Sequence, residues 1–466
     1  MADSGAEARF REGRARLDAG DAAGAEACFR AALAQAPDFA AALGNLGFVL
    51  EDRGALVEAE ACYRRCLELD PTPAQIHLNL GALLLARKRF PEAEAAFLEA
   101  IRCDAQSPRM WSAVGVFLAS TKREEEAERC YRQALELDAD YALASFNLAY
   151  LLLRQGRFEE GWRRLDARDW YGPLQERLGL PRWQGEPLAG RRLLIADEIG
   201  HGDMIQFGRY AAVLKAGGAA RIGLMCQPAL TELLATLDGV DAVFALDAEV
   251  DAAAWDFWSP ALSLPRWCET RLETIPARLP YLQADPRRIV RWAAALPAGG
   301  LKAGLVWRGN PRFENDADRS LPSLEVMAPL GAVAGVHFVS LQKGAGEDEA
   351  VNPPPSLPLL NLGSRMENFA DTAALMANLD LVITVDTAAA HLAGALGKPC
   401  WVMLPDYKTD WRWLTGREDS PWYPGAMRLF RQPPTREWEP VVAHMAGELS
   451  HLVSSHDIAP HGAPGE

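Results

Sequence analysis

The sequence lacks a surplus of positive charge. Lys and Arg number 48 against 63 Asp and Glu, so the net charge is −15 and the pI is about 5.2. Nucleic acids and anionic membranes attract basic proteins, so this balance argues against either as the main partner. The sequence also lacks an apolar run long enough for a membrane span. Its N-terminus has no basic segment followed by an apolar stretch, so we expect no signal peptide.

The sequence has eight cysteines but no Cys-x-x-Cys pair. Cys62 and Cys66 lie one helical turn apart, and no second pair accompanies them to complete a zinc site. We therefore expect buried, reduced thiols and a cytoplasmic protein. The cysteines are Cys28, Cys62, Cys66, Cys103, Cys130, Cys226, Cys268 and Cys400.

Signatures of several cofactors and metals are also missing. There is no Walker A motif and no complete G-x-G-x-x-G after a predicted strand, which argues against an NTPase and a dehydrogenase. The sequence has no histidine cluster that would indicate a metal site. We therefore expect neither a metal nor a cofactor.

What the sequence does contain, before about residue 165, is an internal repeat. Small and aromatic residues recur every 34 positions, a spacing that resembles the tetratricopeptide repeat, a helix–turn–helix unit that stacks into a superhelix. Small residues let two helices approach closely, and we expect the aromatic residues to fill the space between neighbouring units. The small residues are Gly13, Gly47, Gly81, Gly115 and Ala149 in one phase and Ala25, Ala59, Ala93, Ala127 and Gly161 in another, and the aromatic residues are Phe29, Tyr63, Phe97 and Tyr131.

A stack of such repeats has a concave face that can bind an extended or helical peptide. Asn45, Asn79 and Asn147 share one phase of the repeat, on the first helices of their units. Because an asparagine amide both donates and accepts hydrogen bonds, a row of them suits recognition of a peptide backbone. We therefore predict that these three residues bind an acceptor protein. The alternative is that each is bonded within its own repeat.

The pattern of the sequence changes after the repeats. Residues 169–190 are rich in proline, glycine and tryptophan and follow no period, which is typical of a packed connector. From Arg191, short apolar runs alternate with helical segments, as in α/β folds. We predict a repeat array at 6–168, a connector at 169–190, α/β domains at 191–297 and 298–435, a helix at 436–453 that crosses back to join the two domains, and a disordered tail at 454–466.

The first α/β domain brings a carboxylate to the end of a strand. The predicted strand Leu193–Ala196 leads into the sequence D-E-I-G-H-G-D-M-I-Q-F-G-R-Y. Gly200 and Gly202 allow a sharp turn there, and a helix is expected from Met204 onward. Asp203 thus lies at the C-terminal end of a strand, where open α/β sheets bind ligands.

The second α/β domain contains a strand–turn–helix–strand unit. Leu381–Val385 is predicted to be a buried parallel strand, Ala388–Leu396 a helix and Cys400–Leu404 the next strand. Asp386 and Thr387 stand where the helix begins, and the unpaired N–H groups of a helix start favour a phosphate. The alternative is that these two residues only cap the helix.

Further polar side chains follow neighbouring strands of the same domain. Arg308 and Asn310 follow its first predicted strand, and Gln342 and Lys343 follow its second. The ends of parallel strands share one edge, so we expect these residues on one rim with the helix start. Cationic side chains beside a helix start form a diphosphate site without a metal. The alternative is a set of solvated loop residues.

Several segments together resemble bacterial tetratricopeptide-repeat glycosyltransferases. They are E-I-G-H-G-D-M-I-Q-F-G-R-Y, G-L-V-W-R-G-N-P, F-V-S-L-Q-K-G, D-L-V-I-T-V-D-T-A-A-A-H-L-A-G-A-L-G-K-P, D-W-R-W-L and S-P-W-Y-P. The catalytic half is similar to ADP-heptose:lipopolysaccharide heptosyltransferases and the architecture to O-GlcNAc transferases, and the group includes flagellin O-glycosyltransferases. The resemblance implies a tetratricopeptide superhelix followed by a GT-B fold, with two Rossmann-like domains and a C-terminal crossover helix.

The resemblance also implies roles for single residues. Asp203 falls on the aspartate proposed as general base in heptosyltransferases. Asp386, Thr387 and His391 fall on the D-T-x-x-x-H motif that contacts the donor's phosphates, and Lys343 falls on the donor-side lysine.

This sequence departs from the group at two positions. His201 stands where relatives usually carry an apolar residue, and Ala388, at a donor-binding position, stands where heptosyltransferases often have glycine. Because the ordinary pKa of histidine suits proton transfer near neutrality, His201 is predicted to share or take over the role of base. The alternative for His201 is a loop histidine without a role, and for His391 a packing histidine bonded to a backbone carbonyl.

These observations predict an inverting, metal-independent glycosyltransferase that moves a sugar from a nucleotide sugar to Ser or Thr hydroxyls of an acceptor protein. The array would present the acceptor, and flagellin is the acceptor that the resemblance suggests. Two alternatives stay open: a scaffold whose glycosyltransferase half is inactive, and a transferase that acts on a glycan.

Overall fold

The computed structural model describes residues 5–168, 170–198, 200–313 and 315–456. The chain divides into two compact units, Met1–Leu151 and Leu152–Glu466. The division falls inside helix α9 (Ala142–Arg154), whereas the array was expected to extend to residue 168. Helix α10 (Phe158–Leu165) therefore belongs with the second unit, although the repeat period continues through it.

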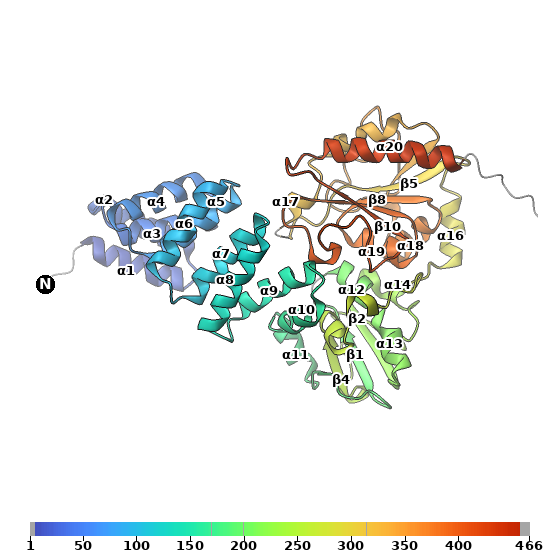
Figure 1. The fold of residues 1–466 in the computed structure, drawn as a ribbon, viewed down its shortest axis with the longest axis horizontal. Helices are drawn as coiled ribbons and strands as arrows, with labels where there is room; N and C mark the ends of the chain where they lie inside the picture. Colours follow the sequence, from blue (N-terminus) through green and yellow to red (C-terminus); the bar gives the residue numbers. More distant parts are fainter. Residues whose placement is uncertain (1–4, 169, 199, 314, 457–466) are drawn as a thin grey trace, which may run out of the picture. The chain divides into compact units, whose positions relative to one another are not determined.

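The first unit is an array of helix hairpins (Figure 1). The two helices of each hairpin pack against each other, and each hairpin packs against the next. The helices are α1 (Gly5–Asp18), α2 (Ala22–Gln35), α3 (Ala40–Asp52), α4 (Leu56–Leu69), α5 (Ala74–Ala86), α6 (Phe90–Cys103), α7 (Pro108–Ser120), α8 (Glu124–Leu137) and α9.

The predicted glycines are required by the packing inside each repeat. A Cβ atom on Gly47 would lie 2.6 Å from the ring of Tyr63, which is too close for any side chain. The aromatic ring thus fills the space between the two helices of one repeat, and it also reaches the next unit as expected, since the rings of Phe97 and Phe117 lie 5.5 Å apart. The other glycine–aromatic pairs are Gly13–Phe29, Gly81–Phe97 and Gly115–Tyr131.

The N-terminal lobe of the second unit contains a parallel sheet in the order β3-β2-β1-β4. The segment before it, expected to lack regular structure, contains helix α11 (Gly172–Leu178). The strands are β1 (Arg192–Ala196), β2 (Arg221–Cys226), β3 (Ala242–Ala245) and β4 (Phe257–Pro260), and the helices are α12 (His201–Phe207), α13 (Tyr210–Ala216), α14 (Thr231–Leu234), α15 (Leu264–Trp267) and the 3-10 helix η4 (Leu272–Thr274).

The C-terminal lobe contains a second parallel sheet in the order β10-β9-β8-β5-β6-β7. The strands are β5 (Leu301–Val306), β6 (Val336–Ser340), β7 (Leu359–Asn361), β8 (Leu381–Val385), β9 (Cys400–Leu404) and β10 (Met427–Arg431). The helices are α16 (Pro286–Ala293), α17 (Asp316–Arg319), α18 (Phe369–Ala377), α19 (Ala388–Ala395), α20 (Glu439–His456) and the 3-10 helices η5 (Leu324–Ala332) and η7 (Trp411–Trp413).

The last helix packs on the C-terminal lobe. The buried face of α20, with Val442, Met445 and Leu449, packs into the core of that lobe beside η5 and β10, and Figure 1 shows the helix lying along it. That α20 also joins the two lobes stays a prediction. The helix also continues through residues 454–456, which were expected to be disordered, and the rest of that expected tail lies outside the described residues.

The predicted fold class is confirmed: a solenoid of helix hairpins precedes two lobes, each built on a parallel sheet, as expected for a GT-B fold. The strongest apolar runs became the most central strands, and all five residues of β8 are buried. Among the helices that the structure describes, none combines the length and hydropathy of a membrane span.

Candidate active site

Asp203 lies in the first turn of α12, just past the carboxyl end of β1. Gly200 precedes the helix in extended conformation, and its carbonyl accepts a hydrogen bond from the Asp203 N–H (3.1 Å). A Cβ atom on Gly200 would lie 3.4 Å from Asp203 Oδ2 and 3.6 Å from the ring of Phe313 in the other lobe. The turn thus presents the carboxylate, 15% exposed, toward the C-terminal lobe.

The Asp203 carboxylate is held by an arginine of the opposite lobe. Arg412, in η7, donates a hydrogen bond from Nη2 to Asp203 Oδ1. Its Nε donates to Gln206 Oε1 (2.8 Å), and its Nη1 donates to both oxygens of Asp410 (3.0 and 3.1 Å). The side chain is only 8% exposed and its guanidinium lies 4.4 Å from the Trp411 ring. This network joins α12 to the C-terminal lobe.

Helix α19 begins opposite α12. Thr387 caps it, since its hydroxyl accepts a hydrogen bond from the Ala389 N–H (3.3 Å). The predicted alternative of a simple cap therefore describes Thr387, whereas Asp386 lies 7% exposed before the cap. Ala388 is the first residue of the helix.

The two helix starts are in close contact. A Cβ atom on Gly202 would lie 2.9 Å from His391 Cδ2 and 3.5 Å from Ala388 Cα, so only glycine permits this approach. His201 stacks on Phe369 at the start of α18, with ring centroids 5.1 Å apart. The structure therefore brings together the acid-bearing turn and the helix start that the sequence predicted separately.

His391 is a buried packing residue with a side-chain partner. Its Nδ1 lies 2.8 Å from the Tyr423 hydroxyl, and its ring stacks on Trp413 at 5.3 Å. The partner is thus a phenol, not the backbone carbonyl considered from the sequence.

Burial changes the proton affinities of this cluster in opposite directions. It raises the pKa of Asp203, although Arg412 opposes the increase. Burial, together with the charge of Asp410, raises the pKa of Asp386 to about 6. Burial lowers the pKa of His201 and, with help from Arg412, lowers the pKa of His391 well below its ordinary value. Both imidazoles are therefore neutral near pH 7. Burial thus weakens the imidazoles as proton acceptors and strengthens the Asp203 carboxylate as one.

Strands β8, β5 and β6 are parallel neighbours, so the residues that follow them lie at one edge of the sheet, the rim. Arg308, after β5, is engaged at the rim: its guanidinium pairs with Glu349 (2.8 Å) and donates to the Pro322 carbonyl. Asn310 is exposed, and its Oδ1 accepts a hydrogen bond from the Arg312 N–H (3.1 Å).

After β6, neighbouring residues behave differently. Gln342 is buried, and its amide accepts from the N–H groups of Trp307 and Arg308 (2.9 and 3.0 Å) and donates to the Arg308 and Ala345 carbonyls. It supports the loops of the rim rather than facing a ligand. Lys343 is 53% exposed, with its Nζ 3.4 Å from the Ser364 carbonyl and 3.9 Å from Glu347. Lys343 is therefore the better placed of the two to meet an anion.

Two arginines in this region were not predicted as site residues. Arg412 lies in the D-W-R-W-L segment, but nothing in the sequence relates it to Asp203, 209 positions away. Arg319 is 15% exposed and lies against the loop after β5, where a Cβ atom on Gly309 would be 2.9 Å from its Nη2. Its charge lowers the pKa of Asp386. An Arg-Ser pair in a polar loop was the only signal for it.

In the array, two predicted asparagines are bonded within the repeats. Asn45 Nδ2 donates to the Ala41 carbonyl (2.8 Å), and Asn79 Oδ1 accepts from Gln75 (2.5 Å). Asn79 also donates from Nδ2 to the hydroxyl of Tyr63 in the preceding repeat (3.5 Å), so the alternative of bonding within one repeat describes Asn45 alone. Asn147 lies half-buried on α9.

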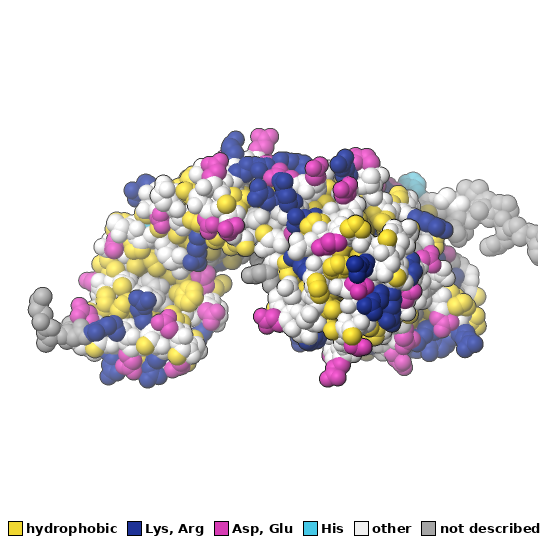
Figure 2. All heavy atoms as spheres, turned by 90° about the horizontal axis from the view of Figure 1, so that it is seen from below, with side chains coloured by type: hydrophobic (Ala, Val, Ile, Leu, Met, Phe, Trp, Pro, Cys, Tyr) yellow, Lys and Arg dark blue, Asp and Glu magenta, His cyan; other side chains and the backbone are white. Residues whose placement is uncertain are grey.

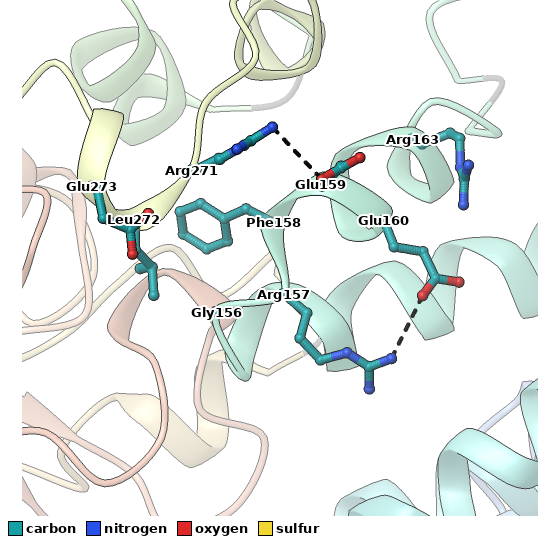
Figure 3. Close-up of a pocket in the computed structure, with 9 residues that line it drawn as sticks. All are labelled: Gly156, Arg157, Phe158, Glu159, Glu160, Arg163, Arg271, Leu272 and Glu273. Carbon is teal, nitrogen blue, oxygen red and sulfur yellow. Dashed lines mark ion pairs between the residues drawn. The ribbon is translucent and has the colours of Figure 1, made fainter.

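A cavity of about 420 Å³ lies elsewhere in the second unit, between the start of α10 and η4 (Figure 3). Charges of both signs line it, and four of them form pairs: Arg271 lies 3.9 Å from Glu159, and Arg157 lies 3.6 Å from Glu160. It shares no lining residue with the rim. Among the described residues, no group of three or more His, Cys, Asp and Glu side chains is placed to hold a metal ion.

Family models match both halves of the chain. Tetratricopeptide repeat models match residues 10–72, 123–162 and 52–116, and the model of glycosyltransferase family 9 (heptosyltransferase) matches residues 335–402. The latter segment runs from β6 to β9 and contains Lys343, Asp386 and His391.

Among curated proteins, the chain is similar to Protein FlbA of Caulobacter vibrioides, with 30% identity over 345 aligned residues that cover 68% of this chain. The chain spans about half of that relative's length, 56%. Among solved structures it is similar to PilF of Pseudomonas aeruginosa (25% identity, 35% of this chain and 74% of that chain, TM-score 0.33) and to MamA of Desulfovibrio magneticus RS-1 (16% identity, 36% and 94%, TM-score 0.33).

Proposed function

We propose that this chain, in which tetratricopeptide repeats precede a segment of glycosyltransferase family 9, transfers a sugar from a nucleotide-sugar donor to a Ser or Thr hydroxyl of an acceptor protein. The observation that carries the proposal is the contact between the two helix starts, where Gly202 meets His391 and Asp203 reaches the C-terminal lobe. This contact supports the proposal because the Asp203 carboxyl, whose pKa is raised, belongs to the same turn that meets the start of α19, where we propose that a phosphate binds.

The C-terminal lobe would bind the donor. The N–H groups at the start of α19 and the charge of Lys343, with Arg308 and Arg319 nearby on the same rim, would stabilise the diphosphate as negative charge develops on it. We propose that these cationic groups do this work without a metal ion. Arg308 would have to exchange Glu349 for a phosphate oxygen, so Lys343 is the more direct contact.

The N-terminal lobe would supply the base. In the proposed step the acceptor hydroxyl gives its proton to Asp203, and its oxygen forms a bond to the anomeric carbon of the sugar. The bond from that carbon to the phosphate oxygen breaks, and its electron pair leaves with the nucleotide. Attack from the face opposite the leaving group inverts the anomeric configuration.

The array would recognise the acceptor protein. Its surface exposes hydrophobic side chains among charged ones, as on the face in Figure 2, and exposed apolar groups mark protein-binding surfaces when they gather. The large exposed ones are Phe48, Val57, Leu98 and Leu143. Flagellin is our proposed acceptor, on the resemblance alone. A transferase for a glycan is the second candidate, since the family 9 model describes heptosyltransferases.

The test has two stages. UDP, ADP, GDP and CMP are screened for thermal stabilisation of the purified protein, because a ligand that binds the folded state raises its stability. The matching nucleotide sugars are then incubated with the protein and flagellin, and intact mass is measured. A sugar-sized increase on flagellin that requires the chain supports the proposal. Sugar appearing on a glycan instead favours the second candidate, and nucleotide binding without any turnover favours an inactive scaffold.

A further inference from the structure

The contacts of Arg412 distinguish the two oxygens of Asp203. Oδ1 accepts the hydrogen bond from Arg412 Nη2, whereas no described residue donates a hydrogen bond to Oδ2. Oδ2 instead borders the space beside Gly200, with the 38%-exposed Phe313 on its other side. One oxygen is therefore anchored, and the other borders the space beside Gly200 without a hydrogen bond from the described residues.

Arg412 is itself fixed from three directions. Asp410 accepts from Nη1 with both oxygens, Gln206 accepts from Nε, and the Trp411 ring lies against the guanidinium. An arginine held this way cannot rotate freely, and its planar fork gives its partner one preferred orientation.

We propose that Arg412 is the positioning residue of the base: it anchors Asp203 Oδ1 and leaves Oδ2 to accept the acceptor's proton. This inference rests on the proposed function. Asp203 belongs to the N-terminal lobe, whereas Arg412 belongs to the C-terminal lobe, in which we place the donor site. The lobe that binds the donor therefore also supplies the arginine that positions the base.

The surrounding charges show why a cation is needed there. Burial is the largest influence on the Asp203 carboxyl and favours its neutral form, and the charges of Asp410 and Glu198 act in the same direction. Arg412 and, to a smaller extent, Arg168 oppose them. The neighbouring imidazoles, His201 on α12 and His391 on α19, are neutral and cannot supply a positive charge.

The test is the pH dependence of sugar transfer in Arg412→Gln and Arg412→Lys. Loss of a nearby opposite charge should raise the kinetic pKa of the base, so the rising limb of the Gln variant moves upward by about one to three pH units. Its kcat near neutrality falls at least tenfold and recovers partly at higher pH, with little change in donor KM. The Lys variant keeps the charge but not the fork, so its kcat falls while its rising limb stays in place.

Arg417→Gln is the matched control. Arg417 is 39% exposed, and its guanidinium pairs with Asp419 in the same loop region, so its replacement should leave kcat and the pH profile unchanged. A double variant adds specificity: in the Asp203→Asn background, Arg412→Gln should have almost no further effect on kcat, because no base remains to be positioned.

The inference is overturned if the rising limb of Arg412→Gln coincides with that of the wild type, or if the two substitutions lower kcat independently. If Arg412→Gln does not fold, as judged by circular dichroism, the Lys variant decides, and an unchanged kcat there contradicts the inference. Absence of transfer by the wild type with every donor would overturn the proposed function itself, which is a separate outcome.

Discussion

The two units of the chain differ in how deeply their ion pairs are buried. In the array, the pairs that join neighbouring repeats recur at the surface: Arg30–Glu58 and Arg64–Glu92 are each 2.7 Å apart, with all four side chains more than 40% exposed. Arg30 and Arg64 also pair within their own helices with Glu26 and Glu60, whose side chains are 12% and 11% exposed. In the second unit, Arg168 pairs with Glu198 at 2.7 Å, and neither side chain is exposed at all.

This difference indicates which charged residues can be substituted with little loss of stability. Exposed pairs are screened by water and stabilise little, so the array can vary its charges to suit a partner. A buried charge that loses its partner strongly destabilises the fold, so we expect the buried pair Arg168–Glu198 to tolerate little substitution. Glu198 lies in the loop between β1 and α12, and it also accepts hydrogen bonds from Trp170 and Leu262. Burial here fixes the loop that leads to Asp203.

The largest expected effect comes from removing α10. Phe158 and Trp162 of this helix pack on Trp422 and Trp411 of the C-terminal lobe, with ring centroids 6.0 and 5.2 Å apart. A chain that starts at Ala142 retains α10 and should fold and bind the nucleotide, whereas one that starts at Trp170 should be largely unfolded. Circular dichroism and calorimetry with the nucleotide compare the two. Equal folding of both fragments would indicate that α10 belongs to the array, as the repeat period suggested.

The next effect compares a buried pair with an exposed one. Arg168→Met leaves Glu198 charged and buried without its partner, and should lower the free energy of unfolding of the second unit by about 3–5 kcal/mol. Arg65→Met, which removes exposed pairs to Asp38 and Glu68 in the array, should change stability too little to measure. Chemical unfolding followed by tryptophan fluorescence measures the first and circular dichroism the second. Similar losses in both would remove the distinction between the units.

Lys343→Ala tests the rim on the donor side. Loss of a charged contact to phosphate should weaken nucleotide binding by about 1.5–3 kcal/mol, without a change in melting temperature, because Lys343 is half exposed. Lys302→Ala is the control, since Lys302 lies in β5 near the amino edge of the same sheet. Calorimetry that finds equal nucleotide affinity in both variants would place the phosphates elsewhere.

The smallest effect concerns Asp386. Its pKa in the folded protein is raised to about 6, so folding disfavours its charged form. Its charge therefore costs stability above about pH 6, and this cost disappears as pH falls below the ordinary carboxyl pKa, where both states are protonated. Asp386→Asn should thus raise the melting temperature at pH 8 and have little effect near pH 3.5. A melting temperature lowered at pH 8 would show that the charge is stabilised by partners.

Patterns local in sequence predicted most of the fold. Leu381–Val385 was predicted with its observed bounds because an uninterrupted run of β-branched and apolar residues suits a central parallel strand. Strand β10 was missed because it lies at the sheet edge and carries two half-buried arginines, Arg428 and Arg431. The repeat period predicted a helix at α10, but it could not predict which surface that helix packs against.

The sequence predicted which segments carry the residues of the candidate site, but not which of these residues contact one another. Parallel strands present their following residues at one edge, so Asp203 and Asp386 could be placed at strand ends from the sequence. The pairing of Asp203 with Arg412 and the burial that neutralises His201 depend on how two lobes pack. No residue pattern encodes such contacts.

The central claim is that Asp203 acts as the base, and transfer rate against pH tests it most directly. Asp203→Asn keeps the shape of the side chain but accepts a proton very poorly, so turnover should fall about 10²–10⁴-fold while nucleotide affinity stays nearly intact. His201→Ala, measured in parallel, should retain most of its turnover, because burial lowers the pKa of that imidazole. Near-normal turnover in Asp203→Asn would contradict the account, and a large loss confined to His201→Ala would assign the base to the histidine.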